Sequence, residues 1–305
     1  MIFNRQIEIK HDEIESSEAD LFFYGSPLDD RGALSTSALN RAKINRGIRV
    51  NLDAEIMTFC IDDSSVRIRN INSYLDIQLE NKPIKKVFLD ATTLGVPEIL
   101  YILRWLARLQ KRVEVDILYV EPESYPPRIE MKSEFGLHQF KLSHSSVGYR
   151  SLPGFTKTVS NNNKTHLIAL LGFERVRLGQ LLTNDEGAFI ENITPIFGVP
   201  SFKPSYDKHT IFQNIDSLKN KAEKPKFSSA NNPYDTYKLL QFIYKGLQGR
   251  VVNIAPIGTK PMAIGACIFI LQNLAANVGV MYDHPQKSLN RTKGFSRIHL
   301  YSITI

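Results

Sequence analysis

The sequence predicts an α/β protein built from two halves, each with a mainly parallel sheet. Continuous apolar runs such as VFLD, LIALL and VVNIA are typical of strands covered on both faces, as the strands of a parallel sheet are. Segments with helical periodicity alternate with these runs along the chain. Proline stands in the expected first turn of several helices, where a missing N–H costs nothing.

The predicted strands are short apolar segments bounded by turn residues. Several of them lack polar alternation, which indicates a buried sheet. We expect strands at Leu21–Tyr24, Glu55–Ile61, Lys86–Asp90, Glu114–Val120, His166–Leu171, Phe189–Phe197, Arg250–Ala255, Val278–Tyr282 and Arg297–Ile303.

The predicted helices occupy segments between these strands and carry start signals. Asn232 can cap a helix that begins with Pro233, and Asp235 then faces the free amides of the first turn. We expect helices at Asn72–Glu80, Pro97–Gln110, Glu174–Leu182, Pro233–Leu247 and Pro261–Ala275.

A polar stretch without hydrophobic periodicity, residues 153–164, separates two parts of the chain. It predicts an N-terminal half of residues 1–152 and a C-terminal half of residues 165–305. The polar stretch 219–232 is predicted to be a surface loop inside the second half.

The two halves share a local plan. In the first, VFLDATTLGVPEIL leads through a helix to VDILYVEP; in the second, VVNIAPIGTKPMAI leads through a helix to VGVMYDHP. Pro97 corresponds to Pro261, and Tyr119 to Tyr282, at nearly the same spacing. Each unit reads as a β-α-β crossover, and we interpret the halves as related and Rossmann-like.

Composition places the chain among ordinary globular proteins, with 43% hydrophobic and 23% charged residues in 305. The formal net charge of +7 fits anionic partners such as nucleotides, nucleic acid or an acidic protein, although scattered solvating charges explain it equally well. Neither dense basic stretch, 82–86 or 219–226, interleaves aromatic and basic residues as a nucleic-acid groove does.

The sequence lacks the patterns that predict a metal site, a disulfide or a membrane segment. Cys60 and Cys267 lie in apolar runs and read as reduced core residues, and the histidines have no metal-ligand spacing. The charged N-terminus is no signal peptide, and polar residues interrupt the apolar segment 261–280. We therefore expect a cytoplasmic protein with no membrane contact, no cofactor and no metal.

The turn at residues 255–261 is the leading candidate for a binding site. In open α/β sheets, ligands bind beyond the carboxyl ends of strands, where helix N-termini present free N–H groups to phosphate. Gly258 would let the backbone approach a ligand, Thr259 offers a hydroxyl, and Lys260 offers a cation. The alternative is a tight turn with a solvated lysine.

This turn resembles a known family. The string NIAPIGTKPMAIGA is similar to the strand-to-helix signature of CARF domains, the CRISPR-associated Rossmann-fold sensors, in which Gly-Gly-Thr-Lys follows an apolar strand. The match lacks the first glycine, because Ile257 stands there. The resemblance implies a homodimer that binds a cyclic oligoadenylate or related nucleotide through Thr259 and Lys260, as a regulatory component of bacterial antiviral defence. No effector domain is evident.

Three further residues make the equivalent turn of the first half a second candidate. Thr92 and Thr93 can bind a polar ligand, and Asp90 can accept a hydrogen bond from a ribose hydroxyl. Asp90 is also a candidate nucleophile of a phosphatase, although that class has a second aspartate where Thr92 stands. The alternative for Asp90 is a cap of the next helix.

Two more turns follow predicted strands. After LIALL, Arg175 is a candidate phosphate ligand, whereas Glu174 beside it is equally explained as a carboxylate stabilising the helix dipole. The turn 24–32 is rich in groups that bind polar ligands but reads more simply as a surface turn of Gly, Pro and Asp.

Two other function classes stay open. Asp116, Glu130 and Lys132 mimic the constellation of metal-dependent nucleases, in which two carboxylates hold Mg²⁺ and a lysine steadies the attacking water. A non-catalytic scaffold that works with an ATPase or nuclease partner is the other. The helix 261–275 is apolar nearly all round, and its Gly265 and Ala266 permit close approach, which motivates the homodimer hypothesis.

Overall fold

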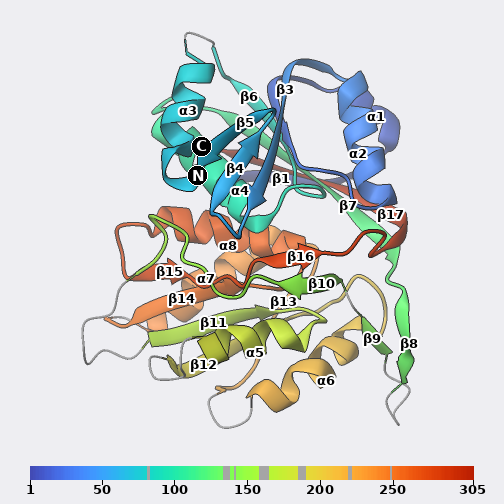
Figure 1. The fold of residues 1–305 in the computed structure, drawn as a ribbon, viewed down its shortest axis with the longest axis vertical. Coiled ribbons are helices and arrows are strands. Elements are labelled where there is room, and N and C mark those ends of the chain that lie inside the picture. Colours follow the sequence, from blue (N-terminus) through green and yellow to red (C-terminus); the bar gives the residue numbers. More distant parts are fainter. Residues whose placement is uncertain are drawn as a thin grey trace. The chain divides into compact units, whose positions relative to one another are not determined.

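The computed structural model describes residues 1–80, 83–132, 138–140, 142–157, 165–184, 190–218, 222–247 and 249–305, without the side chains of residues 127–132, 138–139 and 184. The chain forms two compact units (Figure 1). Unit 1 comprises Met1–Tyr125 and Leu289–Ile305, and unit 2 comprises Pro126–Ser288. The predicted boundary at 153–164 falls inside unit 2, and residues 158–164 lie outside the described residues.

Unit 1 has a mixed sheet. Within the described residues its eight strands have the order β1-β17-β7-β6-β2-β3-β4-β5. The four strands β7, β6, β2 and β3 pair in parallel with one another. The pairings outside this parallel group are antiparallel. Its elements are β1 Ile2–Ile9, α1 His11–Glu15, β2 Glu18–Tyr24, α2 Asp30–Arg41, β3 Lys43–Asp53, β4 Thr58–Ile61, β5 Ser64–Arg67, η1 Ile68–Asn70, α3 Ile71–Gln78, β6 Lys86–Asp90, α4 Val96–Arg108, β7 Glu114–Ser124 and β17 Lys293–Thr304.

Unit 2 has a parallel sheet. Its order in the described part of the chain is β13-β12-β11-β14-β15, with α7 and α8 on one face and α5 and α6 on the other (Figure 1). Its elements are β8 Pro127–Lys132, β9 His138–Phe140, β10 Ser143–Ser146, β11 Thr165–Leu171, α5 Arg175–Asn184, β12 Ile190–Gly198, α6 Tyr206–Leu218, β13 Lys226–Ser228, α7 Pro233–Gly246, β14 Val251–Pro256, α8 Lys260–Gln272, β15 Val278–Val280 and β16 Pro285–Lys287.

The α/β class is confirmed, and the prediction of mainly parallel sheets holds for unit 2 but not for unit 1. The last strand, β17, returns to unit 1 and pairs antiparallel with both β1 and β7. Sequence periodicity does not report which strand a segment pairs with, so this return was not predicted. Both crossovers of the shared plan are present, as β6-α4-β7 and β14-α8-β15.

Several predicted element boundaries are wrong for local reasons. Residues 54–57 form the turn between β3 and β4, with Met57 at a φ of 50°, so the strand predicted from Glu55 begins at Thr58. The strand predicted to end at Tyr282 ends at Val280. The helix predicted to reach Ala275 ends at Gln272. Phe189, the predicted start of another strand, lies outside the described residues.

Helices α2 and α6 escaped prediction because their sequences carry a weak apolar stripe. The helix α2 reads DRGALSTSALNR, in which small and polar residues dominate. Its Ala38 and Leu39 are nevertheless buried in a cluster with Phe22, Phe88 and Leu118 of the sheet. Packing on the sheet therefore stabilises a segment whose own periodicity is weak.

Helix α8 is buried from Pro261 to Ile270. A Cβ atom at its Gly265 would collide with the carbonyl oxygen of Pro233, at the start of α7. The small residue thus serves the packing of α7 on α8 within unit 2. The homodimer stays a prediction without support from this glycine.

Glycines permit neighbouring crossover turns to touch at the carboxyl end of each sheet. In unit 2, a Cβ at Gly172, after β11, would lie 2.8 Å from the carbonyl oxygen of Ile257, after β14. In unit 1, a Cβ at Gly25, after β2, would lie 2.8 Å from the carbonyl oxygen of Thr93, after β6. The two sheets therefore share the same close contact between the turns of adjacent parallel strands.

We predict that Gly172→Ala destabilises the protein by about 1–3 kcal/mol, because backbone must move to admit the new methyl group. The matched control is Gly179→Ala, inside α5, where an added Cβ meets nothing within 4 Å. That change should stabilise the protein by about 0.5–1 kcal/mol. Urea denaturation measures both, and equal effects of the two substitutions would contradict the packing role of Gly172.

Candidate functional site

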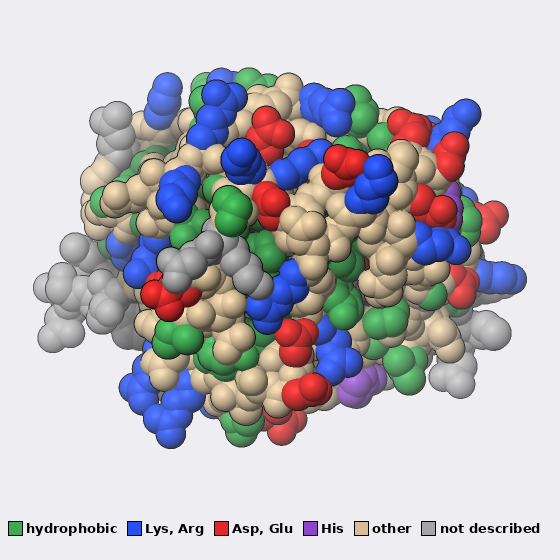
Figure 2. Space-filling view, turned by 90° about the horizontal axis from the view of Figure 1, so that it is seen from above, with side chains coloured by type: hydrophobic (Ala, Val, Ile, Leu, Met, Phe, Trp, Pro, Cys, Tyr) green, Lys and Arg blue, Asp and Glu red, His purple; other side chains and the backbone are tan. Residues whose placement is uncertain are grey.

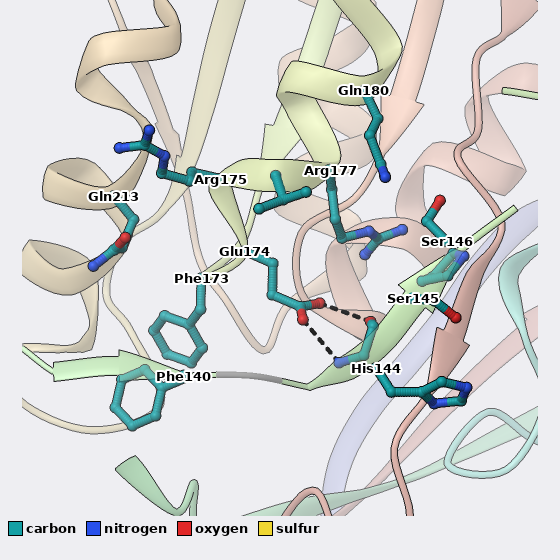
Figure 3. Close-up of a pocket in the computed structure, with 13 residues that line it drawn as sticks. Phe140, His144, Ser145, Ser146, Phe173, Glu174, Arg175, Arg177, Gln180 and Gln213 are labelled. Carbon is teal, nitrogen blue, oxygen red and sulfur yellow. Dashed lines mark hydrogen bonds between the residues drawn. The ribbon is translucent and has the colours of Figure 1, made fainter. Parts of the chain in front are cut away.

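A pocket opens at the carboxyl end of β11, over the first turn of α5. It has a volume of about 210 Å³. Figure 3 shows Phe140 and Phe173 side by side, with Arg177 and Gln180 farther along and Arg175 beside Gln213. The lining residues are Phe140, Ser143, His144, Ser145, Ser146, Phe173, Glu174, Arg175, Val176, Arg177, Gln180, Gln213 and Pro285.

Aromatic side chains form one wall of this pocket. The ring centroids of Phe140 and Phe173 lie 4.7 Å apart. Tyr206 and His209 of α6 pack edge-on against Phe140, with centroid distances of 5.8 and 5.4 Å. The wall is therefore supported from behind. Phe140 is itself buried, so Phe173, which is partly exposed, is the ring on which a planar group can stack.

Arg177 is locked in place by Asp283, just after β15. Its Nε and Nη2 donate to the two carboxylate oxygens of Asp283 at 2.8 and 2.6 Å, and Nη1 donates to the carbonyl oxygen of Ile257 at 3.3 Å. Burial opposes the charge on Arg177, but the Asp283 carboxylate outweighs it and raises the pKa of the guanidinium. All three arms of the fork are engaged, so Arg177 ties α5 to the ends of β14 and β15.

Glu174 holds the strand β10 over the pocket. Its Oε1 accepts from the amides of Leu142 and Ser143 at 2.9 and 2.8 Å, and its Oε2 accepts from the Ser143 hydroxyl at 2.9 Å (Figure 3). The sequence suggested a helix-dipole role for Glu174. The structure adds a specific partner segment that lies far away in the chain.

Arg175 is the exposed cation at the rim of the pocket. Its side chain is 54% exposed and its ion pair with Asp216 of α6 is loose, with 3.8 Å between Nη1 and Oδ2. Exposed pairs of this length contribute little, so the guanidinium is free to turn toward an anion. The first-turn amides of α5 and the positive end of the helix dipole lie at the same place.

The turn predicted as the leading site, Gly258-Thr259-Lys260, lies at the carboxyl end of β14 as expected. The Thr259 hydroxyl donates to the Ala230 carbonyl oxygen at 2.6 Å and accepts from the Met262 amide at 3.5 Å, as the N-cap of α8. Pro261 removes one first-turn donor. Gly258 packs on the end of β11, where a Cβ would lie 3.2 Å from the Leu170 carbonyl.

In unit 1, the second candidate group organises its own turn. Asp90 is fully buried and accepts from the Ser35 and Thr93 hydroxyls, both at 2.8 Å, and from the Thr92 amide at 3.0 Å. Burial raises the pKa of Asp90, against these hydrogen bonds. The N-cap of α4 is Gly95, so the expectation that Asp90 caps this helix is wrong.

The two threonines are used in the same way. The Thr92 hydroxyl accepts from the Val120 amide at 3.0 Å, and the Thr93 hydroxyl accepts from the Gly25 amide at 2.9 Å. These bonds connect the turn after β6 with Val120 inside β7 and with the turn after β2. The binding role predicted for Asp90, Thr92 and Thr93 stays a prediction, and these bonds explain the residues without a ligand.

Unit 1 has its own locked arginine, in the first turn of α2. Arg31 is buried, and its Nη2 donates to Asp29 Oδ2 at 2.7 Å, its Nε to the Thr292 hydroxyl at 3.0 Å, and its Nη1 to the Val120 carbonyl oxygen at 3.3 Å. Arg31 and Arg177 thus occupy corresponding places after the first strand of each parallel group.

Sequence reasoning missed both locked arginines, although one signal was visible. A cation in the first turn of a helix opposes the helix dipole, so Arg31 and Arg177 required partners elsewhere. Asp29 stands two residues before Arg31, so that partner was visible in the sequence, whereas Asp283 comes more than a hundred residues after Arg177 and was not.

The nuclease constellation gains no support from Asp116. This residue lies in the first half of β7, away from the strand's carboxyl end, where its carboxylate pairs with Lys86 Nζ at 3.2 Å and accepts from Ser302. The side chains of Glu130 and Lys132 lie outside the described residues. In the described part of the chain, no group of three His, Cys, Asp or Glu side chains is placed to hold a metal ion.

None of the helices formed by the described residues is long and apolar enough to cross a bilayer.

We predict that Glu174→Gln releases β10. A glutamine has one acceptor oxygen in place of two, and hydrogen bonds to a charged group contribute about 1.5–3 kcal/mol. Hydrogen exchange at the Leu142 and Ser143 amides should accelerate about 10- to 100-fold. Glu191→Gln is the control, because Glu191 is 42% exposed and paired with Arg250 only at 3.8 Å. Unchanged exchange at Ser143 would contradict the anchoring role.

We predict an acid-sensitive step in the stability of unit 1. Burial alone would raise the pKa of Asp29, but the hydrogen bonds and charges of Arg31, Thr292 and Arg291 outweigh it and lower that pKa. A lowered carboxyl pKa stabilises the fold above its unfolded value near about 4, and this contribution is lost as the pH falls through the folded pKa.

Asp29→Asn should therefore cost about 3–5 kcal/mol at neutral pH, because two buried cations lose their carboxylate. The difference from wild type should shrink below about pH 4. Urea denaturation across pH measures it, with the fully exposed Asp63→Asn as control. A difference that stays constant with pH would rule out the ionic origin.

Comparisons with known proteins leave this site to be judged on its own geometry. No protein-family model matches the chain, and no curated protein matches it. The features of the chain that point to a function are the pocket of unit 2 and the arginines at the carboxyl ends of the parallel strands.

Proposed function

We propose that unit 2 is a binding module for a nucleotide, with the base in the pocket over α5 and the phosphate at its rim. The observation that carries this proposal is the combination, at the carboxyl end of β11, of an aromatic wall with the exposed guanidinium of Arg175. Ligands of open α/β sheets bind at such an edge.

The size of the pocket fits one part of a nucleotide, the base, and not the whole molecule. Sites for whole drug-sized ligands usually measure about 300–1,000 Å³. A cavity of about 210 Å³ suits a planar base and leaves the sugar and phosphate outside. Stacking of a base on an aromatic side chain contributes about 1–3 kcal/mol.

Charge favours the rim as the phosphate position. Inside the pocket, Glu174 is engaged by three donors, and Arg177 and Asp283 neutralise each other. The cation left to an incoming ligand there is Arg175. The turn Gly258-Thr259-Lys260 packs against the Gly172 turn, so Lys260, the first residue of α8, lies at the same edge of the sheet, outside the residues that line the pocket.

The corresponding strand order in the two units supports the interpretation as Rossmann-like halves. The order β3-β2-β6-β7 corresponds to β12-β11-β14-β15, with all neighbours parallel. Together with the resemblance of residues 257–260 to CARF domains, it supports the further proposal of a regulatory nucleotide sensor in antiviral defence. A homodimeric state and an effector partner such as an ATPase or nuclease belong to this proposal.

Titration calorimetry with AMP, adenosine and inorganic phosphate tests the binding proposal. We expect wild type to bind AMP, and Arg175→Gln to bind it at least tenfold more weakly, because a charged hydrogen bond contributes about 1.5–3 kcal/mol. Affinity for adenosine should change little, since the base site is intact. Lys260→Ala should weaken AMP binding to a smaller extent.

Arg250→Gln is the matched control. Arg250 is 48% exposed and pairs with Glu191 at 3.8 Å, nearly the same environment as Arg175, but it lies at the amino end of β14. If both variants lost the same AMP affinity, the effect would come from the net charge of the protein and not from a contact of Arg175 with the phosphate. The proposal would be refuted if wild type bound none of the three compounds.

A further inference from the structure

Unit 1 contains an arginine whose charge lacks a full partner. Arg291 precedes β17, and its side chain is only 17% exposed. Its Nε atom is buried and has no hydrogen-bond partner among the described residues. The ion pair that the structure gives it is to Asp29, with 3.7 Å between Nε and Oδ2.

Asp29 has little capacity left for this second cation. Its carboxylate already accepts from Arg31 at 2.7 Å, from the Thr292 hydroxyl at 2.8 Å and from the Gly32 amide at 3.3 Å. Arg31, Asp29 and Arg291 therefore form a cluster with two positive charges and one negative charge. Burial and the repulsion from Arg31 lower the pKa of Arg291, which reports that its charged form is poorly compensated.

An arginine in this setting is unusual unless an anion completes it. A buried hydrogen-bond donor without an acceptor costs about 1–3 kcal/mol, and more when it is charged. The cluster also stands at the N-terminus of α2, a helix of 12 residues capped by Asp29, whose dipole adds positive potential. Tyr119 and Tyr125 lie within electrostatic reach of Arg291.

The two units show a common arrangement. In unit 2 the locked Arg177 has the loosely paired Arg175 two residues before it. In unit 1 the locked Arg31 has Arg291 beside it, joined through Asp29. Each unit thus has one arginine whose guanidinium nitrogens are all engaged by the protein, Arg31 or Arg177. Within the described part of the chain, each also has a second arginine with only one loose ion pair, Arg291 or Arg175.

We propose that unit 1 binds a phosphate group at Arg291, as a second anion site separate from the pocket of unit 2. A phosphate matches the planar guanidinium fork and brings the negative charge that the cluster lacks. The phosphate belongs either to free inorganic phosphate or to a phosphomonoester such as a nucleotide, which share this chemistry.

The experiment uses full-length Arg175→Gln protein, in which the proposed rim contact of unit 2 is removed. Titration calorimetry and thermal melts with inorganic phosphate, AMP and adenosine are run at constant ionic strength, with chloride as the reference anion. We expect inorganic phosphate to bind and to raise the melting temperature, and AMP to gain affinity from the same site, whereas adenosine binding at the intact base pocket of unit 2 should not depend on Arg291. The double variant Arg175→Gln/Arg291→Gln should bind inorganic phosphate at least tenfold more weakly and lose the rise that phosphate causes.

Two further variants keep the test decisive. Arg291→Lys retains the charge without the fork and should keep partial binding even where Arg291→Gln folds poorly. Arg297→Gln, 58% exposed and paired with Glu8 at 3.9 Å, should bind as the parent does. A response to phosphate that survives in the double variant, or no response in Arg175→Gln, overturns this site. Inorganic phosphate has no base and Arg175 is absent throughout, so the dependence of phosphate binding on Arg291 is independent of the proposed function of unit 2.

Discussion

The close contact between neighbouring crossover turns is the constraint on which both sites depend. Adjacent parallel strands lie roughly 4.8 Å apart, so the turns that leave them crowd at the carboxyl end of the sheet. Gly172 and Gly25 relieve this crowding by admitting a carbonyl oxygen where a Cβ would stand. The first helix of each group, α2 or α5, can then begin a short turn beyond its strand, near the carboxyl edge of the sheet.

Buried arginines turn this geometry into a rigid edge. Arg177 connects α5 with the residues after β14 and β15, and Arg31 connects α2 with the end of β7. Each guanidinium satisfies buried backbone and carboxylate acceptors that would otherwise lack a donor. Because all nitrogens of these two guanidinium groups are engaged, we assign them a structural role, and Arg175 and Arg291 are the candidate anion contacts.

The net charge of +7 says less about a binding site than these individual arginines do. On the face drawn in Figure 2, Lys and Arg side chains alternate with Asp and Glu and with uncharged residues. Such mixing favours solvated charges over a continuous basic groove. What distinguishes an arginine here is therefore its partner and its burial, which composition does not report.

Local patterns in the chain were enough to predict the α/β class, the two β-α-β crossovers and the position of the turn at Gly258-Thr259-Lys260 beyond β14, because apolar runs, proline and glycine act locally. The return of β17 to unit 1, the anchoring of β10 by Glu174 and the ion pair of Asp283 with Arg177 became visible in the folded chain. These depend on which distant segments meet, and the pairing of strands and of buried charges is set by packing across the whole unit. For that reason the pocket over α5 and the arginine cluster at Asp29 emerge from the structure alone.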